Sequence, residues 1–513
     1  MHPRIHHWAP RVLSGLAFML VLGSGYIRRV AAQPGPLHDC TAFVVGFVNS
    51  REDQWLTATC VGVYFVSLTF YHCLLRNRIT GGLGAGGSGI AVARWSWPEV
   101  LLGLGIGWAA ARYAFNYQTS YPRMDFLTLL AGAAAGQAVA VTRLRRAGMG
   151  RPRSFHQEAL PLLILTAALA AMFHPDMGES YQYRGHARWT GPCFDPNTFG
   201  VLMGAGIVLA GGGLVQSLRS KVQSRPSAEG GGQGLKSKVQ SLKSNAYRAL
   251  LLAVAAGVMG VGLVKSYSRG AWVGAAVGVA HLAFHIGKAE KLKTERLKAA
   301  RRWGAFLIIF ASVGVLGFWS CRHTERAVAR RAVSVVNAND FSWNRRLVAY
   351  EGALRMLADK PWFGFGWNEP ERVYGALYCP AKVDEGMAIR LNDYLMLGMT
   401  LGLPALLCFV MYVGLSLRAS PKSNVQCPKF QAVNPQIMAQ RLENSGQQSE
   451  DGRPGKELPA PPTLDFRLWT LDSAAVCRAG AIVLLVGFWF DGGLFRLAAG
   501  ATFWILLELG REA

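Results

Sequence analysis

Long apolar runs constrain this chain more than any other feature of its sequence. About twelve segments approach the length of about 20 residues that a bilayer-spanning helix needs. They are 9–27, 55–75, 97–115, 125–143, 158–174, 198–217, 248–266, 270–287, 303–320, 393–417, 475–490 and 493–509. With 51% hydrophobic and 16% charged residues, the apolar side chains are not divided among small soluble cores. The pattern predicts an all-α, polytopic membrane protein with a single transmembrane domain over residues 1–513.

The net charge of +24 lies mainly between these runs. Basic clusters follow the second, fourth, sixth, eighth and tenth runs, at 76–94, 143–153, 218–248, 288–302 and 418–429. Basic residues on alternate loops are typical of the cytoplasmic side of a membrane protein. We therefore expect both termini in the cytoplasm and the interval 321–391 as a large helical loop facing outward. Nucleic acid is not an expected partner, because no folded basic surface remains once the loops are assigned.

Three segments are interpreted as a spanning helix or as linkers. The run 9–27 is followed by Arg28 and Arg29, which favours a first spanning helix over a cleaved signal. Segment 218–247 repeats Ser-Lys-Val-Gln-Ser around a Gly-rich stretch, and 419–465 is rich in Pro, Gln, Ser and Asn. Both are predicted to be disordered cytoplasmic linkers that contact anionic lipid.

A helix is predicted inside the outward loop, between Ser342 and Pro361. Apolar residues recur there at three- and four-residue steps, namely Trp343, Leu347, Tyr350, Leu354 and Leu357. Asp340 or Ser342 can cap its start. Arg345 and Arg346 follow that start, where the helix dipole also favours a negative group. This is a candidate anion site. The alternative is that both arginines solvate an exposed face.

Three further outward segments carry polar residues at helix ends. Segment 185–200 contains His186, Arg188 and Asn197, and its Asp195-Pro196 pair is a helix-start signature. The short connection 265–272 contains Lys265, Ser268 and Arg269, and an arginine on the outer side runs against the orientation rule. Segment 388–406 contains Asn392 and Asp393 at a helix start. Simpler roles remain open: Arg188 as an interfacial anchor, Asn392 and Asp393 as caps.

In order and sidedness, these segments resemble the O-antigen ligase and O-antigen polymerase superfamily of membrane glycosyltransferases. The matching stretches are Phe194 to Gly200, Ser266 to Gly270, Arg346 to Gly366, and Leu391 to Leu395 before Gly402-Leu-Pro. The resemblance implies a GT-C-type helical fold in the bacterial inner membrane, with an active site facing the periplasm. It also implies transfer of a glycan from undecaprenyl diphosphate to a hydroxyl of lipid A core, of another repeat unit, or of a protein, as in lipopolysaccharide biosynthesis.

The resemblance also implies roles for individual residues. Arg269 and Arg346, with Arg188, would contact the diphosphate, while Asn392 and Asp393 would orient the acceptor. The remaining expected substrate-binding residues are Lys265, Ser268, Arg345, Asn197 and His186. One position departs from the family pattern, because ligases carry a histidine immediately before the Asn and this chain has Leu391. Asp393 or His186, and more weakly Asp384 or Glu385, are the candidate replacements, and catalysis without a protein base is also open.

No metal or other cofactor is expected. The nine cysteines show no Cys-x-x-Cys spacing and no Cys/His ligand pattern. We therefore expect activity without divalent cations. Cys321 and Cys379 would both face outward, and a disulfide between them is one hypothesis for how the loop ends are joined.

Three rival functions remain open at this stage. A repeat-unit polymerase of the same superfamily would differ from a ligase only in its acceptor. A transporter of lipid-linked glycans would also need many spans, but it usually carries ionisable residues near the bilayer midplane and paired halves. A non-catalytic assembly partner that has lost its base is the third.

Overall fold

The computed structural model describes residues 97–115, 124–148, 181–183, 185–193, 195–223, 233–291, 328, 331, 341–367, 370–380, 390, 392–418 and 473–511. The predicted spans at 9–27, 55–75, 158–174 and 303–320 lie outside these residues, as do Leu391 and the linker 419–465. A count of twelve spans therefore stays a prediction.

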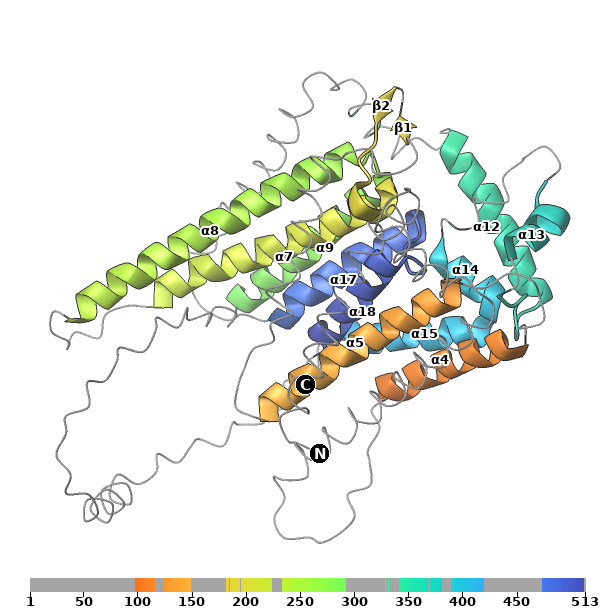
Figure 1. Ribbon diagram of the computed structural model, residues 1–513, viewed down its shortest axis with the longest axis horizontal. Coiled ribbons are helices and arrows are strands. Elements are labelled where there is room, and N and C mark those ends of the chain that lie inside the picture. The colour runs from red at the N-terminus through yellow and green to blue at the C-terminus, as the bar shows by residue number, and fades with distance from the viewer. Residues whose placement is uncertain are drawn as a thin grey trace, which may run out of the picture.

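The described chain is mainly helical, as the apolar runs predict (Figure 1). Its longer helices are α4 (Trp97–Phe115), α5 (Met124–Gly148), α7 (Pro196–Gln223), α8 (Gln233–Lys265), α9 (Arg269–Lys291), α12 (Phe341–Asp359), α14 (Asp393–Leu401), α15 (Leu403–Leu417), α17 (Ser473–Phe490) and α18 (Leu497–Gly510). The short elements are β1 (Gln182–Tyr183), β2 (His186–Ala187), the 3-10 turn η1 (Gly191–Cys193), α13 (Pro370–Val373) and the π-helical turn η2 (Tyr374–Tyr378). β1 and β2 form an antiparallel pair.

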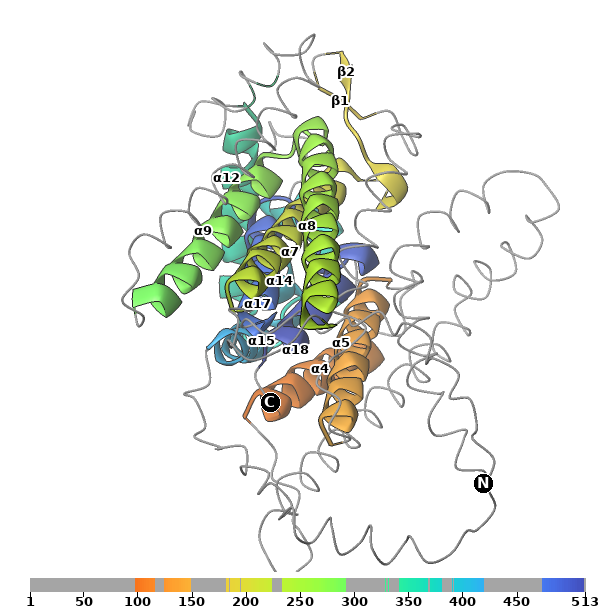
Figure 2. The same cartoon turned by 90° about the vertical axis from the view of Figure 1, so that its left-hand side faces the viewer.

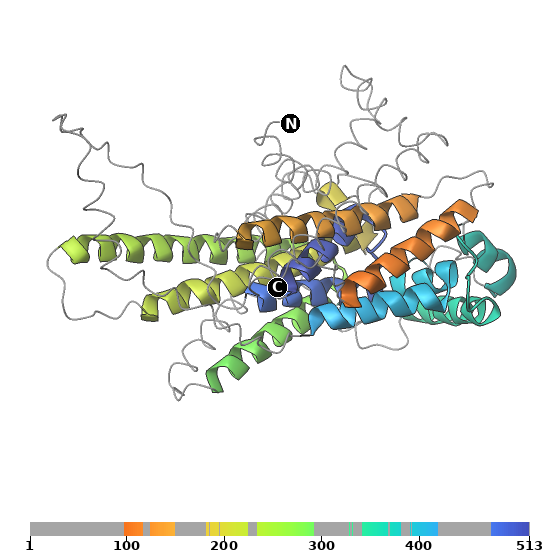
Figure 3. The same cartoon turned by 90° about the horizontal axis from the view of Figure 1, so that it is seen from below.

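These helices form an elongated bundle with α17 and α18 at its centre. α17 packs against α7, α9 and α18, and α18 packs against α5 and α15. α7 and α8 lie together on one flank, with α4 and α15 on another (Figures 1, 2 and 3). α17 can approach α9 closely because a Cβ at Gly278 would lie only 2.3 Å from the Val483 side chain. α12, α13 and the start of α14 lie across one end of the bundle, called here the α12 end (Figure 1).

Among the described residues, one stretch is long and apolar enough to cross a bilayer, Pro196–Val215. Shorter apolar helices cover Asp125–Val141, Ala249–Lys265, Leu403–Leu417, Ala474–Phe490 and Leu497–Gly510. Each of them overlaps a run that the sequence predicts to span. The structure therefore confirms that these runs are helical, and their crossing of a membrane stays a prediction.

The described basic clusters follow helices that begin at the α12 end. α7 and α9 begin there, beside the site described below, and α15 begins beside the turn that follows α12. α5 also begins there, because the ring of Phe126 packs against that of Trp367 in that turn. The clusters at 143–153, 218–248, 288–302 and 418–429 therefore all follow helices that run away from the α12 end. The alternation of basic loops predicts this arrangement.

Two helices extend into the segment predicted to be a disordered linker. α7 continues through residues 218–223 and α8 begins at Gln233, so part of 218–247 is helical. The Ser-Lys-Val-Gln-Ser repeats contain lysine and glutamine, which are good helix formers, and each repeat borders an apolar helix that it can extend. Composition alone did not indicate this extension.

α12 matches the predicted helix in length and in its end before Pro361, but a different face packs against the bundle. That face carries Arg346, Ala349, Ala353 and Met356, all of which are buried. Much of the predicted apolar stripe points outward, since Leu347 is 47% and Leu354 is 54% exposed. The alanines allow close packing against Met396 and Met399 of α14. The periodicity of apolar residues could not show which face of α12 is buried, because neither face is strongly polar.

The turn after α12 is bonded to the break between α14 and α15. The N–H of Phe365 donates to the carbonyl of Met399 at 2.7 Å, and that of Leu403 donates to the carbonyl of Pro361 at 2.7 Å. Gly402 at the break has a φ of 85°, and a Cβ there would lie 2.4 Å from the carbonyl oxygen of Trp362. The break satisfies backbone groups that a continuous helix would have bonded internally. It also fixes the direction in which α14 presents its first residues.

A buried polar network joins four helices at the opposite end of the bundle. Glu508 on α18 accepts hydrogen bonds from the Tyr412 hydroxyl at 2.5 Å and from Nη1 of Arg511 at 3.0 Å. Nη2 of Arg511 lies 3.6 Å from Glu99 on α4, and Gln137 on α5 donates to Glu508 at 3.4 Å. The sequence reasoning did not single out these residues, because they are isolated charges at the ends of apolar runs.

Candidate active site

The carboxylate of Asp491, in the turn between α17 and α18, is the centre of the candidate site. Its Oδ1 lies 3.0 Å from Nη2 of Arg346 on α12. Its Oδ2 accepts a hydrogen bond from the Ser268 hydroxyl, and Nη1 of Arg346 donates to the carbonyl of Phe490. Arg346 is 8% and Asp491 is 4% exposed. Three segments that are distant in sequence therefore hold one buried anionic group.

The turn between α8 and α9 is shaped to approach this carboxylate. Tyr267 has a φ of 51°, which is uncommon for a residue other than glycine. The Ser268 hydroxyl also accepts a hydrogen bond from the N–H of Ala271 at 3.2 Å, so it caps α9 while it donates to Asp491. A Cβ at Gly270 would lie 2.4 Å from Oδ2 of Asp491. Arg269 lies between Ser268 and Gly270 in the chain, at the edge of the site.

Arg188 lies between the β1–β2 hairpin and η1, at the same end of the bundle. The N–H of Arg188 donates to the carbonyl of Tyr181 at 2.8 Å, which positions the backbone. Its Nε donates to the carbonyl of Ser266 at 2.8 Å, and its Nη2 donates to Oδ1 of Asn197 at 2.7 Å. The guanidinium therefore connects the hairpin to the α8–α9 turn and to the first turn of α7.

The electrostatic surroundings of Arg188 place it near the other charged groups. Burial lowers the pKa of the Arg188 guanidinium, and the carboxylates of Asp491 and Asp195 partly offset this effect. Arg346 lowers that pKa as well, because the two positive charges repel each other. Arg188 and Arg346 thus act on each other although they come from segments far apart in the sequence.

Asn392 brings the start of α14 to this cluster. Its Oδ1 accepts hydrogen bonds from two N–H groups in the first turn of α14, both at 3.1 Å. Its Nδ2 and the Nε of Arg346 are buried and make no hydrogen bond of good geometry within the described part of the chain. Both residues lie beside the Tyr350 hydroxyl, since each counteracts the rise in the pKa of Tyr350 that burial causes. Tyr350 itself donates to the carbonyl of Trp489 at 3.0 Å.

Asp393, the residue after Asn392, also contacts the α17–α18 turn. Its Oδ2 accepts a hydrogen bond from the N–H of Leu494 at 2.6 Å, and it is 3% exposed. It is also within electrostatic range of Arg496, whose Nη1 lies 3.4 Å from Oδ2 of Asp195. The turn therefore contacts α7, α9, α12 and α14 through side chains and backbone.

The residues that the sequence singled out divide into three groups. Those that meet around the α17–α18 turn are Arg188, Asn197, Ser268, Arg346, Asn392 and Asp393, with Arg269 adjacent. No contact described for His186 or Lys265 brings its side chain to Asp491, and Arg345 points about 100° around α12 from Arg346. Leu391, Asp384, Glu385 and Cys321 lie outside the described residues.

Sequence reasoning missed Asp491 and Arg496. Asp491 lies between the last two predicted spans and Arg496 lies near the start of the last one, in the short stretch Asp491-Gly-Gly-Leu-Phe-Arg496. Two opposite charges and two glycines between apolar runs were the available signal. The expected alternation of loops also places this turn on the same side as the arginines.

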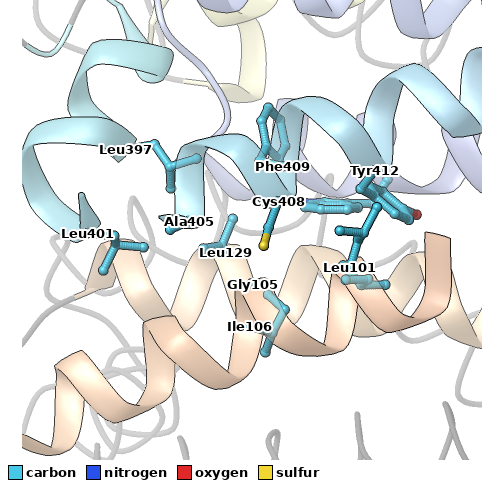
Figure 4. A pocket seen from close by; sticks show the side chains of 12 residues that line it. Leu101, Gly105, Ile106, Leu129, Leu397, Leu401, Ala405, Cys408, Phe409 and Tyr412 are labelled. Carbon is cyan, nitrogen blue, oxygen red and sulfur yellow. The ribbon is translucent and has the colours of Figure 1, made fainter. Parts of the chain in front are cut away.

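An apolar cavity lies apart from these charges, between α4, α14 and α15 (Figure 4). Cys408 and Gly105 are among its lining residues, none of which is charged. Its volume is about 30 Å³. It is lined by none of the charged groups described above, so it is not part of the candidate site.

One comparison with known proteins bears on these residues. Residues 252–410 match the family model described as O-antigen ligase. This segment belongs to the O-antigen ligase family. The O-antigen ligase segment includes α9, α12 and α14, and hence Ser268, Arg269, Arg346, Asn392 and Asp393. No curated protein and no solved structure matches the chain.

Proposed function

We propose that this chain transfers a glycan from a polyprenyl diphosphate carrier to an acceptor hydroxyl during cell-surface polysaccharide assembly. The reaction would take place at the outer face of the bacterial inner membrane. The main support for the proposal is that Arg346 and Ser268 bind the Asp491 carboxylate, and that Arg188 lies within electrostatic range of it. A guanidinium fork binds carboxylate and phosphate oxygens in the same way, so groups that hold one buried anion are suited to another.

On the donor side, the arginines stabilise the leaving group. The acceptor oxygen attacks the anomeric carbon, the bond from that carbon to the phosphate oxygen breaks, and the diphosphate leaves with the electron pair. Negative charge grows on that oxygen as the bond breaks. Fixed guanidinium groups in a buried site stabilise this charge more strongly than water would. Arg346 is held by Phe490 and Asp491, and Arg188 by Ser266 and Asn197, so neither has to reorganise.

On the acceptor side, the start of α14 orients the hydroxyl. The Nδ2 of Asn392 is a buried donor that makes no hydrogen bond of good geometry among the described residues, and it is suited to a sugar oxygen. The acceptor proton passes to the carboxylate of Asp393, which replaces the histidine that Leu391 cannot supply. The N–H of Leu494 holds Asp393 in place at 2.6 Å.

The decisive experiment uses the purified full chain in lipid nanodiscs with a synthetic polyprenyl diphosphate-linked glycan. Transfer predicts equal amounts of released polyprenyl diphosphate and modified acceptor. Movement of intact donor across a vesicle membrane, with no release under any acceptor, would instead support a transporter. Products that grow by whole repeat units would identify a polymerase, and capped lipid or protein would identify a ligase.

A further inference from the structure

Arg496 lies at the end of the α17–α18 turn, and its guanidinium makes little contact with the described part of the protein. Its side chain is 52% exposed, and its Nη1 lies 3.4 Å from Oδ2 of Asp195. Within the described part of the chain, this ion pair is the one polar contact recorded for the guanidinium. A guanidinium carries five N–H donors in a fixed fork. Arg496 therefore keeps most of its capacity to bind an anion.

Asp195 does not occupy that fork. Its Oδ2 accepts hydrogen bonds from the backbone N–H of Thr198 at 2.8 Å and from the Thr198 hydroxyl at 2.6 Å. At 3.4 Å the contact with Arg496 is an electrostatic pairing rather than a short hydrogen bond. Asp195 thus caps α7 and balances the charge of Arg496, while the donors of Arg496 stay available.

The other arginines differ in this respect. Arg346 spends one Nη donor on Phe490 and another on Asp491, and Arg188 spends its Nε and Nη2 on Ser266 and Asn197. Both are positioned by protein acceptors. Arg496, half exposed and with one long ion pair, is instead placed to meet a ligand.

The position of Arg496 is electrostatically unusual. It is the N-cap residue of α18, and its side chain makes no cap hydrogen bond. A cation at a helix N-terminus faces the partial positive charge of the helix, whereas an anion there would be bound by both. At the same α17–α18 turn, the Nε of Arg346 is buried and makes no hydrogen bond within the described part of the chain, so a donor besides those of Arg496 remains there for an anion.

Arg496 also flanks the proposed site closely. It follows Asp491 by five positions in one turn, and its partner Asp195 precedes Asn197, the partner of Arg188, by two positions. Asp393 on α14 lies within its electrostatic range. The guanidinium therefore contacts the residue that caps α7 and lies within electrostatic range of α14, the segment assigned to the acceptor.

We propose that Arg496 binds a phosphate group of the lipid-linked diphosphate directly, next to the groups held by Arg188 and Arg346. A diphosphate carries two phosphate groups, and the exposed fork of Arg496 can bind one of them while the buried arginines bind the other. This inference rests on the proposed function and adds a binding residue to it.

The test measures binding of undecaprenyl diphosphate, with uncharged undecaprenol as the reference lipid, to the full chain in nanodiscs. Arg496→Gln should raise the Kd for the diphosphate about ten- to hundredfold, the usual effect of losing a charge-assisted contact. Arg496→Lys should give a smaller rise, because it keeps the charge and loses the fork. Arg355→Gln, an exposed arginine on α12, is the matched control and should leave the Kd unchanged.

Asp195→Asn separates binding from a structural role. The amide oxygen can still cap α7, and the competing negative charge is gone, so the Kd should stay equal or fall. The inference is overturned if Arg496→Gln binds within twofold of wild type, or if Asp195→Asn raises the Kd as much as Arg496→Gln does. If wild type does not prefer the diphosphate to undecaprenol, the proposed function fails together with this inference.

Discussion

Arg346 and Asp491 form a buried ion pair across 145 positions of the chain, with 3.0 Å between Nη2 and Oδ1. The pair joins the helix of the outward loop to the last turn of the bundle. A carboxylate of the protein thus lies where the arginine was expected to meet a phosphate. Asp491 keeps the guanidinium in a fixed position.

Arg346→Ala should reduce glycan transfer by about 10²- to 10³-fold, because a fixed donor to the developing negative charge is lost. Arg346→Lys should restore only part of the transfer rate. It keeps the positive charge, but a single ammonium cannot bind two oxygens side by side. Initial rates of polyprenyl diphosphate release would show both effects. Equal membrane levels of the variants are the control, and full activity of Arg346→Ala would contradict the assigned role.

Asp491→Ala should lower the free energy of unfolding by about 3–5 kcal/mol, because it leaves the buried Arg346 without a counterion. The double variant Arg346→Ala with Asp491→Ala should lose clearly less than the sum of the two single losses. Thermal or denaturant unfolding of the detergent-solubilised protein measures all three values. Strict additivity would mean that the two side chains do not interact.

Gly402→Ala should destabilise the α14–α15 break by more than 1 kcal/mol, roughly the cost of forcing a side chain into a sparsely populated backbone conformation. The added Cβ would also lie 2.4 Å from the carbonyl oxygen of Trp362. Gly414→Ala on α15 is the matched control, because a Cβ there meets nothing within 4 Å. The two variants should differ in their unfolding midpoints, and identical midpoints would count against this account of the break.

Glu508→Ala should cost about 3–5 kcal/mol, because it leaves Arg511 and the Tyr412 hydroxyl without their buried acceptor. Glu351→Ala removes a carboxylate from an exposed ion pair with Arg355 and should cost less than about 1 kcal/mol. Unfolding midpoints of both variants give the comparison. Transfer activity per folded molecule should be unchanged in both, since Glu508 lies at the opposite end of the bundle and the Glu351 side chain is exposed to solvent.

Local features of the site could be predicted because they depend on neighbouring residues. Asn392 caps α14 as its residue type and position indicate, and α12 ends before Pro361 for the same kind of reason. The arginines could be singled out because basic residues are rare on the outer side. His186 and Lys265 satisfied the same criteria, yet no described contact brings their side chains to Asp491. The predicted side of the membrane tells at which end of the bundle a residue lies, but not where it lies at that end.

The sequence by itself determined that the described runs are helical, that basic loops alternate along the chain, and that Ser268, Arg346 and Asn392 belong to one end. These properties follow from apolar length, helix caps and charge placement, which are local. The tertiary structure alone decided which face of α12 packs, that Asp491 receives Arg346 and Ser268, and that Arg496 keeps its donors available. Such contacts depend on how closely helices pack, and small residues such as Gly270 set that distance without any periodic signal in the sequence.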